Sequence, residues 1–320
     1  DSEREVVIEE IKRTQDSPSR LSSYQLFSSV YKHHPYRRPV IGYSDVVKKT
    51  PVDKIKKLYF ERYCPENMFL LVVGDFESAE MKKKIQKQFN TLKGKLRKVQ
   101  RPKEKQGGGF ELALEKSPFQ ESYLNLAWPT FEATEQEKIV LDLLSYILAH
   151  GDNTRLIQSL RLQKPIVNDI GAFQFTSKDP GFFSITCYFE LKYLEEILER
   201  IADEILILLT NTVLESEICK AINQIESSEF YQETMDSYAR KIGNYEFLYS
   251  DPDHFEKYLK QVKKVKPEDI SKAVKKFFHP EKLKISLVYP EKEASPQEII
   301  ESWAKDFTDA FNSLKDEKTL

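Results

Sequence analysis

Residues 50–73 read TPVDKIKKLYFERYCPENMFLLVV, and residues 266–288 read KPEDISKAVKKFFHPEKLKISLV. Each stretch has a proline at a helix start, an aspartate two residues later, an aromatic-x-Pro-Glu exit and then an apolar run typical of a strand. The two prolines are 14 residues apart in one copy and 13 in the other. This shared order predicts an internal repeat, and therefore two domains with the same helix-then-strand ending.

The two copies are 215 to 216 residues apart, and this offset predicts where each domain begins. The second domain begins near Phe110, so the matching start of the first lies about 105 residues before Asp1. We expect residues 1–92 to be the C-terminal part of a first domain and residues 93–109 to be a basic, glycine-ended linker. Residues 110–292 form the second domain and residues 293–320 a C-terminal helix.

The apolar periodicity predicts an α+β fold along the whole chain. The expected helices include two within the first 31 residues, one that has Thr50 as its N-cap and Pro51 at its first position, and one long helix over residues 215–248. The expected strands are residues 69–73, 110–114, 123–127, 166–176, 182–189 and 283–288. They predict mainly antiparallel sheets covered by helices, with the first domain incomplete at its N-terminus.

Composition excludes several classes of function. Lysine and arginine number 49 and aspartate and glutamate 51, so the formal charge of −2 argues against a nucleic-acid-binding protein. Only 10 glycines occur, without a phosphate-binding glycine motif, and no apolar run approaches the roughly 18 residues of a transmembrane helix. The three cysteines are far apart and are expected to be buried small apolar side chains.

The opening helix carries the first candidate chemistry. Glu3 and Glu10 are seven residues apart, so they share one helix face with their Cα atoms about 10.5 Å apart along the axis. At that separation a metal ion cannot be bound directly by both, but one carboxylate can bind it while the other orients the site. The alternative is a solvated glutamate face without further function.

The segment that begins at Glu3 and ends at Pro18 resembles the part of the pitrilysin/insulinase family of metallopeptidases that carries the third zinc ligand. The bacterial two-domain members, relatives of the mitochondrial processing peptidases, are the most similar. The most specific part of the likeness is HPYRRPVIG at residues 34–42, and it continues through residues 63–75. In the second half, residues 151–161 resemble the glycine-rich turn and helix of the non-catalytic domain of the family.

The resemblance implies a role for four residues. Glu10 is implied as a zinc ligand, with Glu9 as the second choice, and Glu3 as the catalytic carboxylate that orients and polarises the site. Arg161 is implied to hold the substrate backbone, although it could also be an ordinary surface arginine. Asn168 stands where many members have a tyrosine, and this departure puts the oxyanion role of the tyrosine in doubt here.

The inverted zinc motif H-x-x-E-H, which supplies two histidine ligands and the general base, is absent from these 320 residues. The five histidines are His33, His34, His150, His254 and His279. The adjacent pair His33 and His34 cannot converge on one ion as i,i+4 positions do, so we expect both to be structural residues of a loop. The resemblance implies that the motif lies about 70 to 80 residues before Glu10.

The function implied by the resemblance is that of a zinc metallo-endopeptidase fragment, whose parent hydrolyses peptides in a chamber between two homologous domains. Zn²⁺ is the implied cofactor, with two histidine ligands in the missing N-terminal part, and the fragment alone is expected to be inactive. The alternative is a non-catalytic subunit of a heterodimeric peptidase. The implied partners are a peptide or unfolded polypeptide and a homologous subunit, without nucleic acid. The likeness to bacterial members favours export over a cytoplasmic location.

Overall fold

The structure is a computed structural model, and it describes residues 2–97, 99–100, 102–104, 109–179, 181–210, 213–230 and 234–317. The chain forms two compact units. The first unit comprises Asp1–Ile11, Ile41–Arg101 and Glu229–Phe255, and the second comprises Lys12–Val40, Pro102–Ser228 and Glu256–Leu320. Each unit is therefore built from segments that are far apart in the sequence.

The second unit contains a mixed sheet of five strands in the order β1-β5-β2-β4-β3. The strands are β1 (Glu111–Ser117), β2 (Ser122–Pro129), β3 (Asp169–Phe175), β4 (Phe182–Phe189) and β5 (Lys284–Pro290). Only β1 and β5 are parallel, and the other neighbours are antiparallel, as expected for a mainly antiparallel sheet. Strands β2 and β5 are almost wholly buried because they lie inside the sheet, between other strands and two layers of helices.

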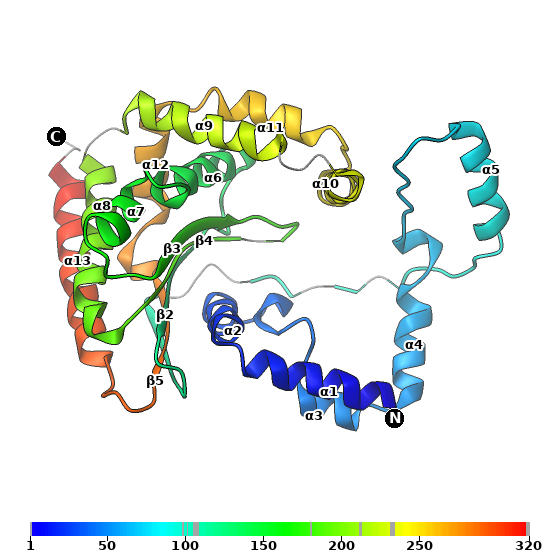
Figure 1. Ribbon diagram of the computed structural model, residues 1–320, viewed down its shortest axis with the longest axis horizontal. Helices are drawn as coiled ribbons and strands as arrows, with labels where there is room; N and C mark the ends of the chain where they lie inside the picture. Colours follow the sequence, from blue (N-terminus) through cyan, green and yellow to red (C-terminus); the bar gives the residue numbers. More distant parts are fainter. Residues whose placement is uncertain are drawn as a thin grey trace. The chain divides into compact units, whose positions relative to one another are not determined.

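Helices cover one face of this sheet (Figure 1). Helix α6 (Glu135–Ala149) packs on β3, and α8 (Leu194–Thr210), α12 (Pro267–Phe277) and α13 (Gln297–Glu317) pack against α6 or one another. Helix α6 begins with a capping box of Thr134 and Glu137, which satisfies its first free amides. The remaining elements of this layer are α7 (Arg155–Ile157), α9 (Glu215–Phe230), α11 (His254–Val262) and the short turns η3 (Gln158–Leu162), η4 (Leu191–Tyr193) and η5 (Pro280–Lys282).

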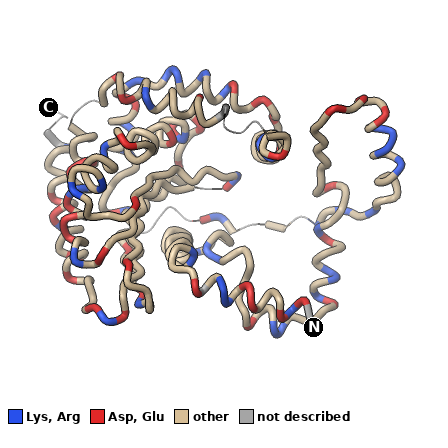
Figure 2. The backbone as a smooth tube through the Cα atoms, in the orientation of Figure 1, with Lys and Arg blue, Asp and Glu red and all other residues tan. Residues whose placement is uncertain are grey.

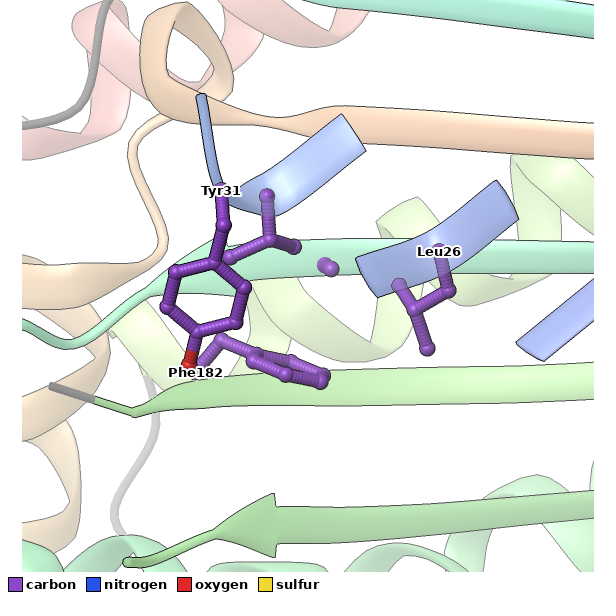
Figure 3. Close-up of a cluster of buried hydrophobic side chains, with 5 residues drawn as sticks. Leu26, Tyr31 and Phe182 are labelled. Atoms are coloured by element: carbon purple, nitrogen blue, oxygen red, sulfur yellow. The ribbon is translucent and has the colours of Figure 1, made fainter. Parts of the chain in front are cut away.

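Helix α2 (Pro18–Val30) covers the opposite face of the sheet and packs on β5, β2 and β1. Its Leu26 and Val30 lie in a buried cluster with Tyr31, Ala127 and Phe182, three of which are labelled in Figure 3. The amide of Asn125 on β2 donates to the hydroxyls of Ser22 on α2 and Ser286 on β5, at 2.8 and 2.9 Å. A polar bridge and an apolar cluster together fasten α2 to the sheet.

The first unit is helical in the part that the structure describes. Its elements are α1 (Ser2–Gln15, which continues into the second unit), α3 (Ser44–Lys49), α4 (Val52–Arg62), η2 (Pro65–Asn67), α5 (Ser78–Phe89) and α10 (Met235–Tyr249). Arg4 on α1 donates to the carbonyls of Lys48 and Thr50 at the end of α3, which ties these helices together. Helix α10 lies close to the segment that follows η2. If Gly243 on α10 carried a Cβ atom, that atom would be 3.4 Å from Cδ2 of Leu71.

The expected strand at residues 69–73 does not form. The segment has no strand partner among the described residues, and the exposed fractions of Phe69 and Leu70 are 54% and 55%. By the repeat offset of 215, residues 69–73 correspond to the first five residues of β5, which pairs with β1 and β2. An apolar run becomes a strand only where neighbouring strands satisfy its backbone, and none is present here.

Three smaller expectations are also wrong. The helix expected over residues 215–248 is two helices, α9 and α10, because Thr234 caps a new start by accepting from the amide of Ser237. Pro51, in extended backbone, is the N-cap of α4, so Thr50 lies one residue outside the helix. Cys64 and Cys187 are buried as expected, but Cys219 is exposed on α9.

Residues 93–109, expected to be a linker, contain no helix or strand in their described part. Residues 98, 101 and 105–108 of this segment lie outside the described residues. The charges of both signs are mixed along the helices, as Figure 2 shows for α1 and α13. No helix in the described chain is both long and apolar enough to cross a membrane.

Candidate functional site

Helix α1 presents the two glutamates that the sequence singles out. Its Ile8 and Ile11 are buried, whereas the side chains of Glu3 and Glu10 are exposed in the first unit. Glu9, the second choice as ligand, is exposed as well. The helix therefore holds Glu3 and Glu10 on one face, about two turns apart, as two carboxylates from one rigid element.

The described residues do not form a complete zinc site. No group of three or more His, Cys, Asp or Glu side chains among them is placed to hold a metal ion. A catalytic zinc needs three protein ligands, and the carboxylate of Glu10 alone supplies one. The donor set in this part of the chain is therefore insufficient for the metal that the resemblance implies, and no zinc-dependent step can be derived from it.

Of the two histidines before Pro35, His34 is buried and structural, as expected. The Nδ1 atom of His34 accepts from the amide of Tyr36 at 3.3 Å, and its ring lies edge-on to the Tyr36 ring with a centroid distance of 4.3 Å. Its Nε2 atom is 3.6 Å from a carboxylate oxygen of Asp179. His33 is exposed, and its backbone amide donates to Glu104.

Arg161 lies in η3, a single turn of π-helix that follows α7. The turn is closed by the bond from the amide of Gln163 to the carbonyl of Gln158, at 2.9 Å. Such widened turns interrupt the regular helix and are frequent at functional sites. The guanidinium of Arg161 is 3.3 Å from Asp169, with side chains 46% and 59% exposed. Because an exposed pair of this kind is weak, the guanidinium can exchange the carboxylate for another acceptor at small cost.

Asn168 is held beside Arg161 at the start of β3. Its backbone amide donates to the carbonyl of Tyr188 on β4 at 2.7 Å, and its Nδ2 donates to Glu121 at 2.6 Å. The adjacent Asp169 is the partner of Arg161, so both predicted residues bond near the start of β3, but to different carboxylates: Arg161 to Asp169 and Asn168 to Glu121. The fixed carboxamide keeps an oxygen and a second N–H that can bond a peptide group.

Arg161, Asp169, Asn168 and Glu121 form what we call the cluster around Arg161, and Glu121 is the member that the sequence does not indicate. Its carboxylate accepts from Asn168 and also from the hydroxyl of Tyr123, at 3.2 Å. Burial, followed by this bond and the charge of Glu121, raises the pKa of Tyr123 to about 12, so the phenol stays protonated. Glu121 is 47 positions before Asn168 in the sequence, and only the pairing of β2 with β4 and β3 with β4 brings them together.

The second repeat does not contain a matching zinc site in its described residues. By the repeat offset, Glu10 corresponds to Ile225 or Glu226 on α9. Ile225 is buried, and the carboxylate of Glu226 pairs with Lys263. Both positions therefore have structural roles in the second unit.

The family model described as "Peptidase M16 inactive domain" matches residues 50–225, which is more than half of the chain. The chain therefore belongs to the peptidase M16 family. This confirms the resemblance to the pitrilysin-type zinc metallopeptidases.

Bacterial zinc proteases are among the relatives of the chain. It is 28% identical over 186 residues to the zinc protease PqqE of Helicobacter pylori, a match that covers 57% of this chain and 42% of the relative. Matches to uncharacterized zinc proteases of Streptomyces coelicolor and Rickettsia felis are 21% and 23% identical and cover 84% and 86% of this chain. The chain covers 60% and 66% of those relatives, so it spans less than two thirds of the length of all three.

Solved structures share the fold. A protease from Helicobacter pylori superposes with a TM-score of 0.79 at 23% identity, covering 90% of this chain and 71% of that one. A peptidase M16 inactive domain from Pseudomonas fluorescens also gives 0.79, at 17% identity, covering 92% and 71%. The expected α+β fold is thus confirmed.

Proposed function

We propose that this chain is part of a zinc metallo-endopeptidase that hydrolyses peptides between two homologous domains. Glu10 contributes one zinc ligand and Glu3 the carboxylate that orients it. Arg161 and Asn168 hold the substrate backbone. The two histidine ligands and the general base belong to a segment that precedes Asp1 in the parent protein.

The observation that carries this proposal is the exposed apolar surface of the first unit. In the second unit, α12 buries Ile270, Ala273 and Val274 against other helices. The matching side chains of α4 are Ile55, Leu58 and Tyr59, and all three are more than half exposed. Residues 69–73 likewise have no strand partner among the described residues, so in that part of the chain this face lacks the strands and helices that cover its counterpart.

Membership of a peptidase family supports the proposed zinc-dependent hydrolysis of peptides. The chain lacks H-x-x-E-H, belongs to a peptidase family and has relatives named zinc proteases that are longer than itself. A longer parent can supply the ligands that the described residues lack.

The test is to neutralise single glutamates of α1 in the parent protein. Replacing Glu10 by Gln removes the proposed ligand charge, so we expect zinc content to fall by at least tenfold and peptide hydrolysis to be lost. Glu5→Gln is the matched control, because Glu5 is exposed on the same helix but about 140° away from Glu10. Glu9→Gln tests the second choice. Normal zinc content in Glu10→Gln would contradict the assignment.

The alternative is a non-catalytic subunit of a heterodimeric peptidase. The matched family model is described as an inactive domain, which supports this alternative. The coding sequence ahead of Asp1 distinguishes the two. An H-x-x-E-H about 70 to 80 residues before Glu10 supports the enzyme, whereas its absence supports the subunit.

The location of the parent protein and its assembly are part of the same proposal. We expect an exported bacterial protein that associates with a homologous subunit or encloses its substrate alone. Fractionation of cells and the mass of the purified parent in solution test these two statements.

A further inference from the structure

A pocket of about 590 Å³ lies in the second unit, away from the cluster around Arg161. Its lining comprises Tyr24 and Phe27 of α2, the segment Pro35–Val40, and Phe175 at the end of β3. The lining is almost wholly apolar, and the volume is within the range of known ligand sites. Neither the family nor the proposed zinc chemistry accounts for this pocket.

The apolar wall of the pocket is held in place by the buried cluster shown in Figure 3. The Phe27 ring lies edge-on to Phe175 with centroids 5.1 Å apart, and Tyr36 lies edge-on to the same ring at 5.8 Å. Behind them, Tyr31 packs against Phe27 and Tyr36. Aromatic rings that pack on one another in this way form a preformed wall.

The loop that closes the pocket is also fixed. The carboxylate of Glu104 accepts from the backbone amides of His33 and His34, at 2.8 and 2.7 Å. The amides of Arg37 and Arg38 donate to the carbonyls of His34 and Pro35. The loop therefore presents its side chains from a defined backbone rather than from a loose segment.

The mouth of the pocket is positively charged. Arg37 and Arg38 both line it and are both exposed. One N–H of Arg37 donates to the carbonyl of Lys32, while the guanidinium of Arg38 forms no ion pair or hydrogen bond with the described residues. The nearby carboxylate of Asp179 is already engaged by the hydroxyl of Tyr36 and faces His34. A ligand carboxylate can therefore meet the guanidinium of Arg38 and the remaining N–H groups of Arg37.

We propose that this pocket binds an extended peptide segment in which a large apolar side chain stands next to acidic residues. The apolar side chain enters between Phe27, Tyr36 and Phe175, and the acidic side chains meet Arg37 and Arg38. The choice of a peptide rather than a small aromatic acid rests on the proposed peptidase function. The pocket would then retain acidic, apolar segments of a polypeptide at a distance from Arg161.

Isothermal titration calorimetry of the 320-residue chain with three unlabelled peptides tests this proposal. The first peptide is Gly-Gly-Phe-Glu-Glu-Gly, the second has Gly for Phe, and the third has Lys for both Glu residues. We expect the first to bind at least tenfold more tightly than either other peptide at 50 mM salt. We also expect its affinity to fall as the salt concentration rises.

Three variants locate the binding. Ser23 is exposed and lines the pocket, so Ser23→Trp narrows it without removing a packed side chain and should abolish binding. Arg38→Glu should weaken binding by about tenfold. Lys305→Glu makes the same charge change on α13, in the helix layer on the other face of the sheet, and should leave binding unchanged.

Several outcomes would overturn the proposal. These are no binding of the first peptide, binding that Ser23→Trp and Arg38→Glu leave unchanged, and 3-phenylpropionate binding as tightly as the first peptide. No arm requires zinc or turnover, so a parent without protease activity would leave this result intact, and a negative result here would leave the zinc assignment intact.

Discussion

At the scale of single residues, the site depends on side chains held by partners far away in the sequence. Glu10 and Arg161 are candidates because each stands in a quoted motif, and Asn168 because it stands where many members of the family have a tyrosine. Glu121 could not be predicted, since nothing in residues near it signals its bonds to Asn168 and Tyr123. Arg38 and Phe175 likewise line the same pocket only because the fold brings them together. Contacts of this kind are set by strand register, which a single sequence does not specify.

Glu121 offers a test of this cluster. Replacing Glu121 by Ala removes the acceptor of Asn168 and Tyr123, so the pKa of Tyr123 should fall from about 12 toward 10. Ultraviolet titration of tyrosinate in the variant and in the unchanged chain measures this shift. Tyr123→Phe is the control that identifies the signal. A titration curve unchanged by Glu121→Ala would contradict the bond.

The carboxylate of Glu104 should make the free energy of unfolding of the chain depend on pH. Burial would raise the pKa of its carboxyl, but the bonds from the amides of His34 and His33 outweigh it, and the pKa lies below the ordinary 4.5. The folded chain thus binds this proton more weakly than the unfolded chain. The stabilisation is complete above the unfolded pKa and is lost as the pH falls through the lower folded pKa.

Urea unfolding of Glu104→Gln should reveal this contribution. The variant should be about 1 to 2 kcal/mol less stable at pH 7, because charged hydrogen bonds to two amides are weakened. The difference should shrink as the pH is lowered from 5 toward 3.5. A difference that stays constant over this range would show that the charge of Glu104 does not stabilise the loop.

At the scale of elements, periodicity predicted most helices and strands, because each presents one apolar face to a neighbour. It failed at residues 69–73 and at Thr234 for different reasons. Residues 69–73 have the composition of a strand but no neighbouring strand among the described residues. Thr234 is a local helix cap that divides a helical pattern which otherwise runs on without a break. The packing of α2 on the sheet of the second unit was also not predicted, since the apolar stripe of the helix does not reveal which sheet it covers.

The attachment of α2 to the sheet can be tested at Asn125. Replacing Asn125 by Leu keeps the branched shape of the side chain but removes the amide, which leaves the hydroxyls of Ser22 and Ser286 buried without their donor. We expect a loss of about 2 to 3 kcal/mol in the free energy of unfolding. Ser286→Ala removes only one of the two bonds and should cost about 1 kcal/mol. Equal stability of Asn125→Leu and the unchanged chain would contradict the bridge.

At the scale of the whole molecule, the repeat predicted from the sequence gives the most informative comparison. The second copy, with β5 between β1 and β2, shows what the first copy needs around residues 69–73. The first unit contains the helix and the apolar run but not the neighbouring strands within the described residues. The same reasoning applies to the proposed zinc site, for which Glu10 is one ligand and the described residues place no two further ligands beside it.

We propose that these 320 residues hold one ligand of a zinc site that a preceding segment completes. The most direct measurement is the zinc content and peptide hydrolysis of the purified 320-residue chain beside the parent protein. We predict less than about 0.1 zinc per chain and no hydrolysis for the 320 residues, and about one zinc with hydrolysis for the parent. One tightly bound zinc with turnover in the 320-residue chain would contradict the account.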